Sequence, residues 1–243
     1  MEPKWLPIIG TPFVSRSDHW KTGTPFNGWR ISFAFDSRFA KTIPMQFEID
    51  GKDNDQAYKL LSTLITPRPI AWVTTVNDAG IINAAPYSFF NVFGTQPPIV
   101  AFAPGNRSSG KPKDTAANIA ATGEFVVNLV DEATAEAMHL TSASEPSEVN
   151  ELDVAGLNTI PSERIKPPRI AEAPASMECT VYDVLTIGEN RLVIGYVHVL
   201  HVRDGVLDPE TLRLIPDAYP IIGRMFGSGY TKTRERFDLE LPE

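Results

Sequence analysis

Two long strand patterns in the C-terminal half constrain the fold more than any other feature of the sequence. Residues 175–187 and 191–203 are rich in β-branched and aromatic side chains, and only Gly188-Glu189-Asn190 separates them. A connection this short joins antiparallel neighbours, because parallel strands need a crossover of about a dozen residues or more. The pair therefore predicts a long antiparallel hairpin and, with it, a mainly β fold.

Shorter patterns upstream predict further strands and a few helices. The expected strands are residues 70–76, 99–103 and 125–130, and the expected helices are residues 55–65, 114–122 and 133–139. Asn77-Asp78-Ala79-Gly80 is typical of a hairpin turn after the first strand. Residues 141–174 are rich in Ser, Glu and Pro and predict a long surface excursion. Because strands outnumber helices, we expect a small antiparallel barrel with peripheral helices.

The first 44 residues differ from the rest of the chain. They contain three of the four tryptophans, Trp5, Trp20 and Trp29, and show no sustained strand or helix period. One interpretation is an irregular arm whose aromatic residues pack on the domain or on a partner subunit. The other is that Met45 is the biological start, since ordinary domain patterning begins there. In both cases residues 45–243 form the domain and residues 1–44 lie outside it.

The acidic charge balance excludes several kinds of partner. The chain has 22 basic and 30 acidic residues among its 243, a net charge of −8, which opposes general binding to nucleic acid or to an anionic membrane. Cys179 is the single cysteine, and His198 and His201 fall on opposite faces of a strand, so we expect no metal site. The chain shows neither a signal sequence nor an apolar run of about 18 residues, so we expect a cytoplasmic protein.

The segment 105–115 predicts an anion site. It fits the pattern G-x-x-x-x-G-K, but Pro112 stands where a triphosphate-binding loop needs a Ser or Thr for magnesium, so we reject a triphosphatase. The cations and hydroxyls of the segment are Arg107, Ser108, Ser109, Lys111 and Lys113. Free N–H groups at a helix start bind anions. We therefore favour a phosphate site over the alternative, a solvated loop with Asp114 or Thr115 as a plain N-cap.

A second segment, residues 83–91, combines strand character with residues that interrupt a strand. Its sequence Asn-Ala-Ala-Pro-Tyr-Ser-Phe-Phe-Asn places small residues and a proline where a strand normally carries bulky side chains. Such an interruption exposes backbone groups and lets a flat ligand such as a flavin ring approach closely. Taken alone, the simpler interpretation is a barrel strand with a bulge.

Several blocks in order along the chain resemble the flavin reductase-like, FMN-binding split-barrel family. These blocks are Arg68-Pro69-Ile70-Ala71-Trp72-Val73-Thr74-Thr75, Asn83-Ala84-Ala85-Pro86-Tyr87-Ser88-Phe89-Phe90-Asn91, Lys113-Asp114-Thr115, Thr122-Gly123-Glu124-Phe125-Val126-Val127-Asn128, Glu151 with Ala155-Gly156-Leu157, and Arg224 with Gly227 and Tyr230. The similarity covers roughly residues 55–235. It implies a six-stranded, Greek-key-like antiparallel split β-barrel that forms a homodimer with FMN near the subunit interface.

The resemblance also implies site residues. The FMN phosphate would bind the stretch that contains Arg107, Ser108, Ser109, Lys113, Asp114 and Thr115. The ribityl chain and ring would face Thr74, Thr75, Ala85, Pro86, Tyr87, Ser88 and Phe89, with Arg68 and Asn91 completing the cofactor-binding set. His201 and Arg224 would lie near the ring or the incoming substrate and are the candidate catalytic residues. One departure is Tyr196, which stands where many members of the family have Glu.

The function implied by the resemblance is hydride transfer from NADH or NADPH to flavin. Some members of the family release the reduced flavin to a partner monooxygenase, and others hold FMN as a prosthetic group. One alternative is a flavoprotein with tightly bound FMN that acts directly on its own small substrate. Another is a non-catalytic module that holds FMN for storage or sensing. No ribose-reading fingerprint separates NADH from NADPH.

Overall fold

The computed structural model describes residues 46–49, 54–107, 109–215, 217–240 and 242. The chain divides into two units, Met1–Glu48 and Ile49–Glu243. Of the first unit, the structure describes only residues 46–48, which are exposed and form neither helix nor strand. The expected N-terminal arm and its three tryptophans therefore lie outside the described residues. The fold and the site belong to the second unit.

The second unit is mainly β, as the sequence predicts, with four short helices among its described residues. The helices are α1 (Asn54–Leu64), α2 (Asp114–Thr122), α3 (Ala135–Leu140) and α4 (Glu151–Val154). The strands are β1 (Ala71–Val76), β2 (Ile82–Tyr87), β3 (Phe90–Thr95), β4 (Pro98–Phe102), β5 (Glu124–Asn128), β6 (Thr159–Ile160), β7 (Arg169–Ile170), β8 (Ala175–Ile187), β9 (Asn190–Val202), β10 (Ile222–Arg224) and β11 (Tyr230–Lys232). No helix in these described ranges is long and apolar enough to cross a membrane.

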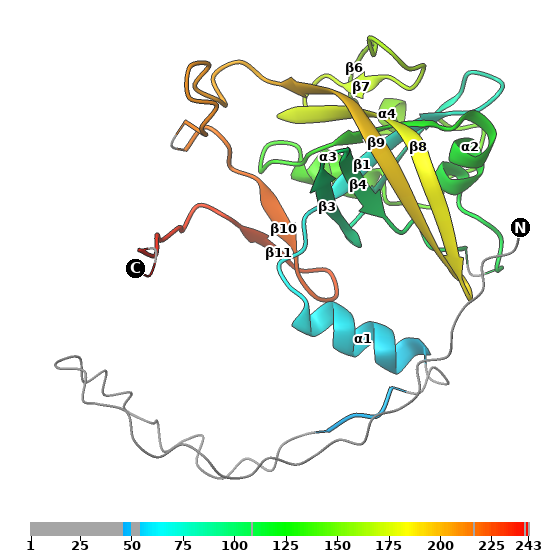
Figure 1. The fold of residues 1–243 in the computed structure, drawn as a ribbon. Helices are drawn as coiled ribbons and strands as arrows, with labels where there is room; N and C mark the ends of the chain where they lie inside the picture. Colours follow the sequence, from blue (N-terminus) through cyan, green and yellow to red (C-terminus); the bar gives the residue numbers. More distant parts are fainter. Residues whose placement is uncertain (1–45, 50–53, 108, 216, 241, 243) are drawn as a thin grey trace, which may run out of the picture. The chain divides into compact units, whose positions relative to one another are not determined.

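One antiparallel sheet organises the unit. Its strand order is β2-β1-β5-β8-β9-β4-β3, so the edges are β2 and β3. The expected long hairpin is confirmed: β8 and β9 are the longest strands, and they reach well beyond their neighbours in Figure 1. Gly188 makes the turn between them with a φ of 59°, a left-handed conformation that glycine adopts at no steric cost.

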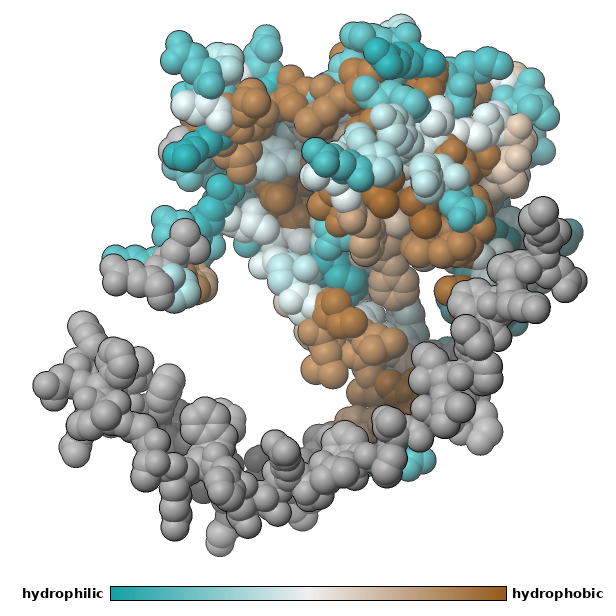
Figure 2. Space-filling view, viewed as in Figure 1, coloured by the Kyte–Doolittle hydropathy of each residue, from teal (hydrophilic) through white to brown (hydrophobic). Residues whose placement is uncertain are grey.

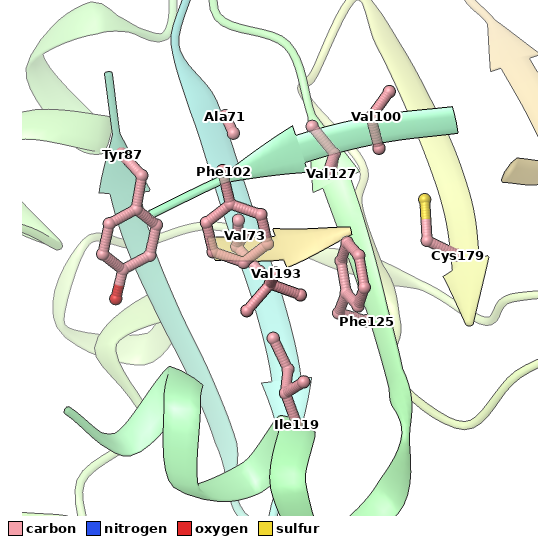
Figure 3. Packing of buried hydrophobic residues seen from close by; sticks show 10 residues of the cluster. All are labelled: Ala71, Val73, Tyr87, Val100, Phe102, Ile119, Phe125, Val127, Cys179 and Val193. Atoms are coloured by element: carbon pink, nitrogen blue, oxygen red, sulfur yellow. The ribbon is translucent and has the colours of Figure 1, made fainter. Parts of the chain in front are cut away.

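The sheet encloses an aromatic core that fixes the positions of its strands. Phe102 of β4 and Phe125 of β5 pack edge to face with ring centroids 5.5 Å apart, and neither is exposed. Tyr87 lies at the margin of this cluster, 5.3 Å from the Phe102 ring (Figure 3). The core thereby holds the end of β2 against β4, although the two strands are not hydrogen-bonded to each other.

The structure differs from the expectations at two places. Residues 141–174 do more than cover the surface, because α4 lies within them and Leu152 is fully buried against Trp72 and Met138. The principal sheet of the described residues has seven strands, where the resemblance implies six. Within this sheet, the strand that lacked a prediction is β3, which pairs with β4 at the sheet edge across a bulge between Val92 and Gly94.

Candidate functional site

A pocket of about 680 Å³ opens where three segments far apart in the sequence meet. We call it the main pocket, and its size is within the usual range for sites that hold small molecules and cofactors. It is lined by Asn83, Ala85, Pro86 and Tyr87 of β2, by Asn106, Arg107, Ser109, Lys113, Asp114 and Thr115 around the start of α2, and by residues 141–145 with Glu151. Residues from both segments that the sequence singles out, 105–115 and 83–91, therefore line the same pocket.

The start of α2 faces the main pocket without a cap from its own chain. Lys113 occupies the N-cap position in an extended conformation, and its side chain makes no capping hydrogen bond. The first N–H groups of a helix need an acceptor, and the helix dipole makes an anion the favoured one. The carboxylate of Asp114, at the next position, accepts hydrogen bonds from Arg107 Nη2 at 2.5 Å and from Ser147 Oγ at 3.1 Å.

Lys113 is the cation that the pocket leaves without a carboxylate partner in the described part of the chain. Its Nζ lies 5.5 Å from the centroid of the Tyr87 ring. Burial lowers the pKa of Lys113, and the nearby Arg107 lowers it further. Two cations that repel each other beside uncapped helix N–H groups are stabilised by a bound anion. This donor set fits a phosphate group.

Another wall of the main pocket is formed by β2, which is an edge strand of the sheet. Because β1 pairs with only one side of β2, alternate backbone groups point outward. Ala84 N–H is one of them and donates to Glu151 Oε2 at 3.1 Å. Pro86, two residues on, has no N–H to leave unpaired, which suits an edge strand. Burial raises the pKa of the Glu151 carboxyl group, and the nearby Asp114 raises it further.

A hydrogen-bonded network joins the two walls at their base. Tyr87 Oη donates to Thr115 Oγ1 at 2.8 Å. Of the two orientations of the Asn83 amide, one gives both of its polar atoms a suitable partner. In that orientation its oxygen accepts from Thr115 Oγ1 at 2.8 Å and its nitrogen donates to Glu151 Oε1 at 3.3 Å. Burial raises the pKa of Tyr87 to about 12, so its hydroxyl stays protonated and acts as the donor at neutral pH. The network fixes β2 relative to the start of α2.

A smaller pocket of about 220 Å³ adjoins the main pocket, and we call it the arginine pocket. It is lined by Tyr58, Ile70, Pro86, Tyr87, Ser88, Met138, His139, Ser142, Arg224 and Tyr230. Three of these residues, Pro86, Tyr87 and Ser142, also line the main pocket. The two pockets therefore meet at the end of β2.

The structure brings most of the predicted site residues to these two pockets. Those that line one or both are Ala85, Pro86, Tyr87, Ser88, Arg107, Ser109, Lys113, Asp114, Thr115 and Arg224. Ser108 lies outside the described residues. Thr74, Thr75, Phe89, Asn91, Arg68 and His201 line neither pocket.

Thr74 and Thr75 are fully buried in β1 and their hydroxyls serve the packing of other segments. Thr74 Oγ1 donates to Pro168 O at 2.6 Å, and Thr75 Oγ1 accepts from Asn118 Nδ2 at 3.1 Å. Phe89, in the β2–β3 connection, and Asn91, near the start of β3, are exposed.

Arg68 is buried and acts as a junction between elements. Its guanidinium donates to Ser62 O at 2.6 Å and Ile65 O at 2.9 Å at the end of α1, to Met225 O at 3.0 Å and to Ser88 Oγ at 3.3 Å. These acceptors use each nitrogen of the side chain. Its place in the fold is therefore to fix the end of α1 and the segment after β10 beside the arginine pocket.

His201 lies in β9 and pairs with a buried carboxylate of β8. Its Nε2 is 2.7 Å from Glu178 Oε1. Glu178 also accepts from the backbone N–H groups of Glu163 and Arg164, both at 2.8 Å. These bonds to the charged form, together with His201, lower the pKa of Glu178 in spite of its burial. The pair thereby holds the loop before β7 onto the sheet.

Glu151 and residues 141–145 are the site residues that inspection of the sequence missed. Their segment is polar and proline-rich, and its burial depends on contacts with β2, nearly 70 residues away in the chain. Glu151 precedes Ala155-Gly156-Leu157 in a block that matches the resemblance. That block was the available signal for this residue.

The mainly β fold, with its large antiparallel sheet and peripheral helices, is that of the split-barrel class of proteins. Residues 63–223 match the Flavin reductase like domain, and the chain belongs to that family. Its class of activity is flavin reductase or flavin-dependent oxidoreductase.

The chain is similar to the following proteins in sequence or structure. An uncharacterized protein of Deinococcus radiodurans is 42% identical over 199 residues, which cover 79% of this chain and 88% of that protein. A 2-nitrobenzoate 2-nitroreductase of Pseudomonas fluorescens is 36% identical with a TM-score of 0.74, covering 82% of this chain and 96% of the other. Nitrilotriacetate monooxygenase component B from Bacillus cereus is 33% identical with a TM-score of 0.77, and the match covers 82% of this chain and 100% of the other.

Proposed function

We propose that the chain is an FMN-binding oxidoreductase that transfers hydride from NADH or NADPH to flavin. The observation that carries the proposal is the main pocket, in which the uncapped start of α2 lies beside Lys113 and Arg107 while the β2 edge forms the other wall. The first wall suits the phosphate that distinguishes FMN from riboflavin. The second offers the backbone and small side chains that a flat ring system can approach.

Different residues of the main pocket would bind the phosphate and the ring of FMN. Lys113, Arg107 and the first N–H groups of α2 would hold the phosphate, with charge-assisted bonds about twice as strong as neutral ones. Ala85 and Pro86 would border the ring, and the Tyr87–Thr115 bond keeps β2 in register with α2. Bound flavin supplies the hydride-accepting chemistry. The protein supplies orientation and excludes water.

The first test is an absorbance spectrum of the purified protein before and after a nicotinamide is added under anaerobic conditions. We expect the yellow flavin bands to be present and to bleach with NADH or NADPH. The nucleotide that bleaches faster identifies the co-substrate. Bound flavin that neither nucleotide reduces would contradict the proposal and favour a non-catalytic binding module.

The second test concerns the phosphate end of the pocket. Lys113→Ala removes one charge-assisted contact, worth about 1.5–3 kcal/mol, so the dissociation constant of FMN should rise about tenfold to a hundredfold. Riboflavin lacks the phosphate and should bind the variant and the wild type within about twofold of each other. Fluorescence-quenching titrations measure both.

Lys111→Ala is the matched control, because Lys111 lies in the same loop and carries the same charge but does not line the pocket. It should leave both dissociation constants nearly unchanged. An equal loss of FMN and riboflavin affinity in Lys113→Ala would place the phosphate elsewhere.

A second candidate function is a flavoprotein that acts directly on its own small substrate. The arginine pocket favours it, because it gives a second ligand a place beside the main pocket. The name of the Bacillus cereus component suggests that that protein supplies a monooxygenase. A reductase of that kind turns over free FMN. In a dedicated enzyme FMN stays bound through repeated turnover. Steady-state assays with and without added free FMN separate the two.

A further inference from the structure

The arginine pocket has the dimensions of a site for one small ring. Its volume of about 220 Å³ equals the share of about seven water molecules at ~30 Å³ each. Because it shares Pro86, Tyr87 and Ser142 with the main pocket, a ligand in it lies directly beside the contents of that pocket. The space accommodates a substituted six-membered ring.

The charge of the arginine pocket is positive and uncompensated. Arg224 forms part of its wall, and Arg68 lies behind it, their backbones joined by hydrogen bonds of 2.9 and 2.8 Å. No Asp or Glu is among the described residues that line this pocket. Arg107, Arg203 and Arg234 each pair with a carboxylate, whereas Arg68 and Arg224 form no ion pair within the described ranges. In a chain of net charge −8, two such guanidinium groups attract an anion.

The Arg224 side chain is held in place over an aromatic ring. Its Cζ lies 4.6 Å from the centroid of the Tyr230 ring, and its Nη2 donates to Gly227 O. His139 meets the same ring edge-on, with centroids 6.4 Å apart. These contacts fix the guanidinium and leave Nε and Nη1 without a hydrogen-bond partner among the described residues. Each of these fixed N–H groups can donate a charge-assisted hydrogen bond to a carboxylate oxygen.

The wall around Arg224 is aromatic. Tyr58, Tyr87 and Tyr230 line the pocket together with His139. Aromatic side chains pack offset or edge-on against a ligand ring, and they contribute large apolar contact areas. A cationic head group set among aromatic side chains selects a ligand that is both flat and negatively charged.

From this combination we propose that the arginine pocket binds a planar aromatic ring that carries a carboxylate. The carboxylate would bind the free N–H groups of Arg224, and the ring would lie among Tyr58, Tyr230 and His139. The inference rests on the proposed function, because it names the class of small substrate that would lie beside the flavin. It concerns binding alone.

The test compares benzoate with benzamide in isothermal titration calorimetry on the full chain. The two probes have the same ring and similar shape, and only benzoate is charged. Benzoate should bind the wild type about tenfold more tightly than benzamide, a difference of ~1.4 kcal/mol. Arg224→Met should remove that preference and leave benzamide within about twofold, while Arg224→Lys should retain part of it because the charge remains.

The matched control is Arg213→Met, since Arg213 is exposed and lines neither pocket. It should leave the preference for benzoate intact. Thermal denaturation of each variant shows whether it is folded. Equal binding of benzoate and benzamide by the wild type, or unchanged benzoate binding in Arg224→Met, would overturn the proposal.

An FMN titration of the same variants separates this inference from the proposed function. FMN affinity that survives in Arg224→Met while benzoate binding is lost supports two separate pockets. A joint loss of FMN and benzoate in a variant that stays folded would assign Arg224 to the flavin and overturn the proposal. A wild type that binds benzoate but no FMN would instead contradict the proposed function.

Discussion

Glu151 is the residue whose ionisation couples the main pocket to pH. Its folded pKa is raised, mainly by burial, so folding favours the neutral carboxyl group. The stability it contributes is therefore present at low pH and is lost as the pH rises through the folded pKa. Glu151→Gln is neutral at every pH and keeps an acceptor for Ala84 N–H. The melting temperature of the variant relative to the wild type should thus increase as the pH rises above about 4, where an ordinary Glu carboxyl group begins to ionise.

Differential scanning calorimetry at several pH values measures this difference. Glu148→Gln is the matched control, since Glu148 is an exposed residue of the same loop, and its difference from the wild type should stay constant. A Glu151→Gln difference that falls as the pH rises would show that the carboxylate is the form that the fold stabilises.

At the residue scale, the sequence singled out side chains whose charge is evident from the residue type alone. Arg107 and Lys113 stand out as cations ahead of a helix in an acidic chain, and both line the main pocket. Thr74 and Thr75 also belong to a block that resembles the family, but both are buried in β1, where their hydroxyls bond to Pro168 and Asn118. Which face of a strand meets a pocket depends on distant segments, and period alone does not reveal it.

At the scale of elements, the close approach of β9 to the core is the most sensitive feature. A Cβ atom added at Gly195 would lie 2.3 Å from Phe125 Cζ, so Gly195→Ala forces the strand or the ring to move. Overpacking of this kind costs about 1–3 kcal/mol. For a domain of this size the melting temperature should fall by roughly 2–12 °C.

Gly94→Ala is the control, because the nearest atoms to its added Cβ lie 3.2 Å away at the edge strand β3. It should lower the melting temperature less than Gly195→Ala does. Combining Gly195→Ala with Phe125→Leu should recover part of the loss, since the two positions share one contact. A double variant that loses stability additively would place the clash elsewhere.

The predicted elements with strong local signals match the structure closely. The residues of α2 are those expected, because Gly123 ends the helix in a left-handed conformation with a φ of 70°. The span of β8 was also predicted, since its hairpin turn is local. In contrast, β3 contains Gly94 and ends before Pro97 and Pro98, which local rules interpret as a break. Pairing with β4 overrides those signals.

At the scale of the whole molecule, the fold class followed from the agreement of turns, periods and strand lengths. The pockets did not, because each is built from segments separated by tens of residues. The expectation that a chain starting at Met45 folds and binds FMN stays a prediction. Size-exclusion chromatography and an FMN titration of that shorter chain test it, and insoluble protein would show that the N-terminal residues belong to the core.

The described surface of the second unit carries exposed apolar side chains that a partner could cover. Apolar side chains gather over α1 in Figure 2, where Leu64 is 76% exposed, and Phe93 of β3 is 64% exposed. Large exposed apolar surfaces of this kind mark interaction sites. We propose that a second copy of the chain covers them, which agrees with the homodimer that the sequence resemblance implies.

Multi-angle light scattering should therefore give a mass twice that of the 26.8 kDa chain. Leu64→Lys and Phe93→Lys place a charge in the apolar surface, and we expect each to shift the equilibrium toward the monomer because an unpaired charge is costly to bury. Thr63→Lys adds the same charge at an exposed polar position of α1 and should leave the dimer intact. A wild type that is monomeric with FMN fully bound would show instead that one subunit completes the flavin site alone.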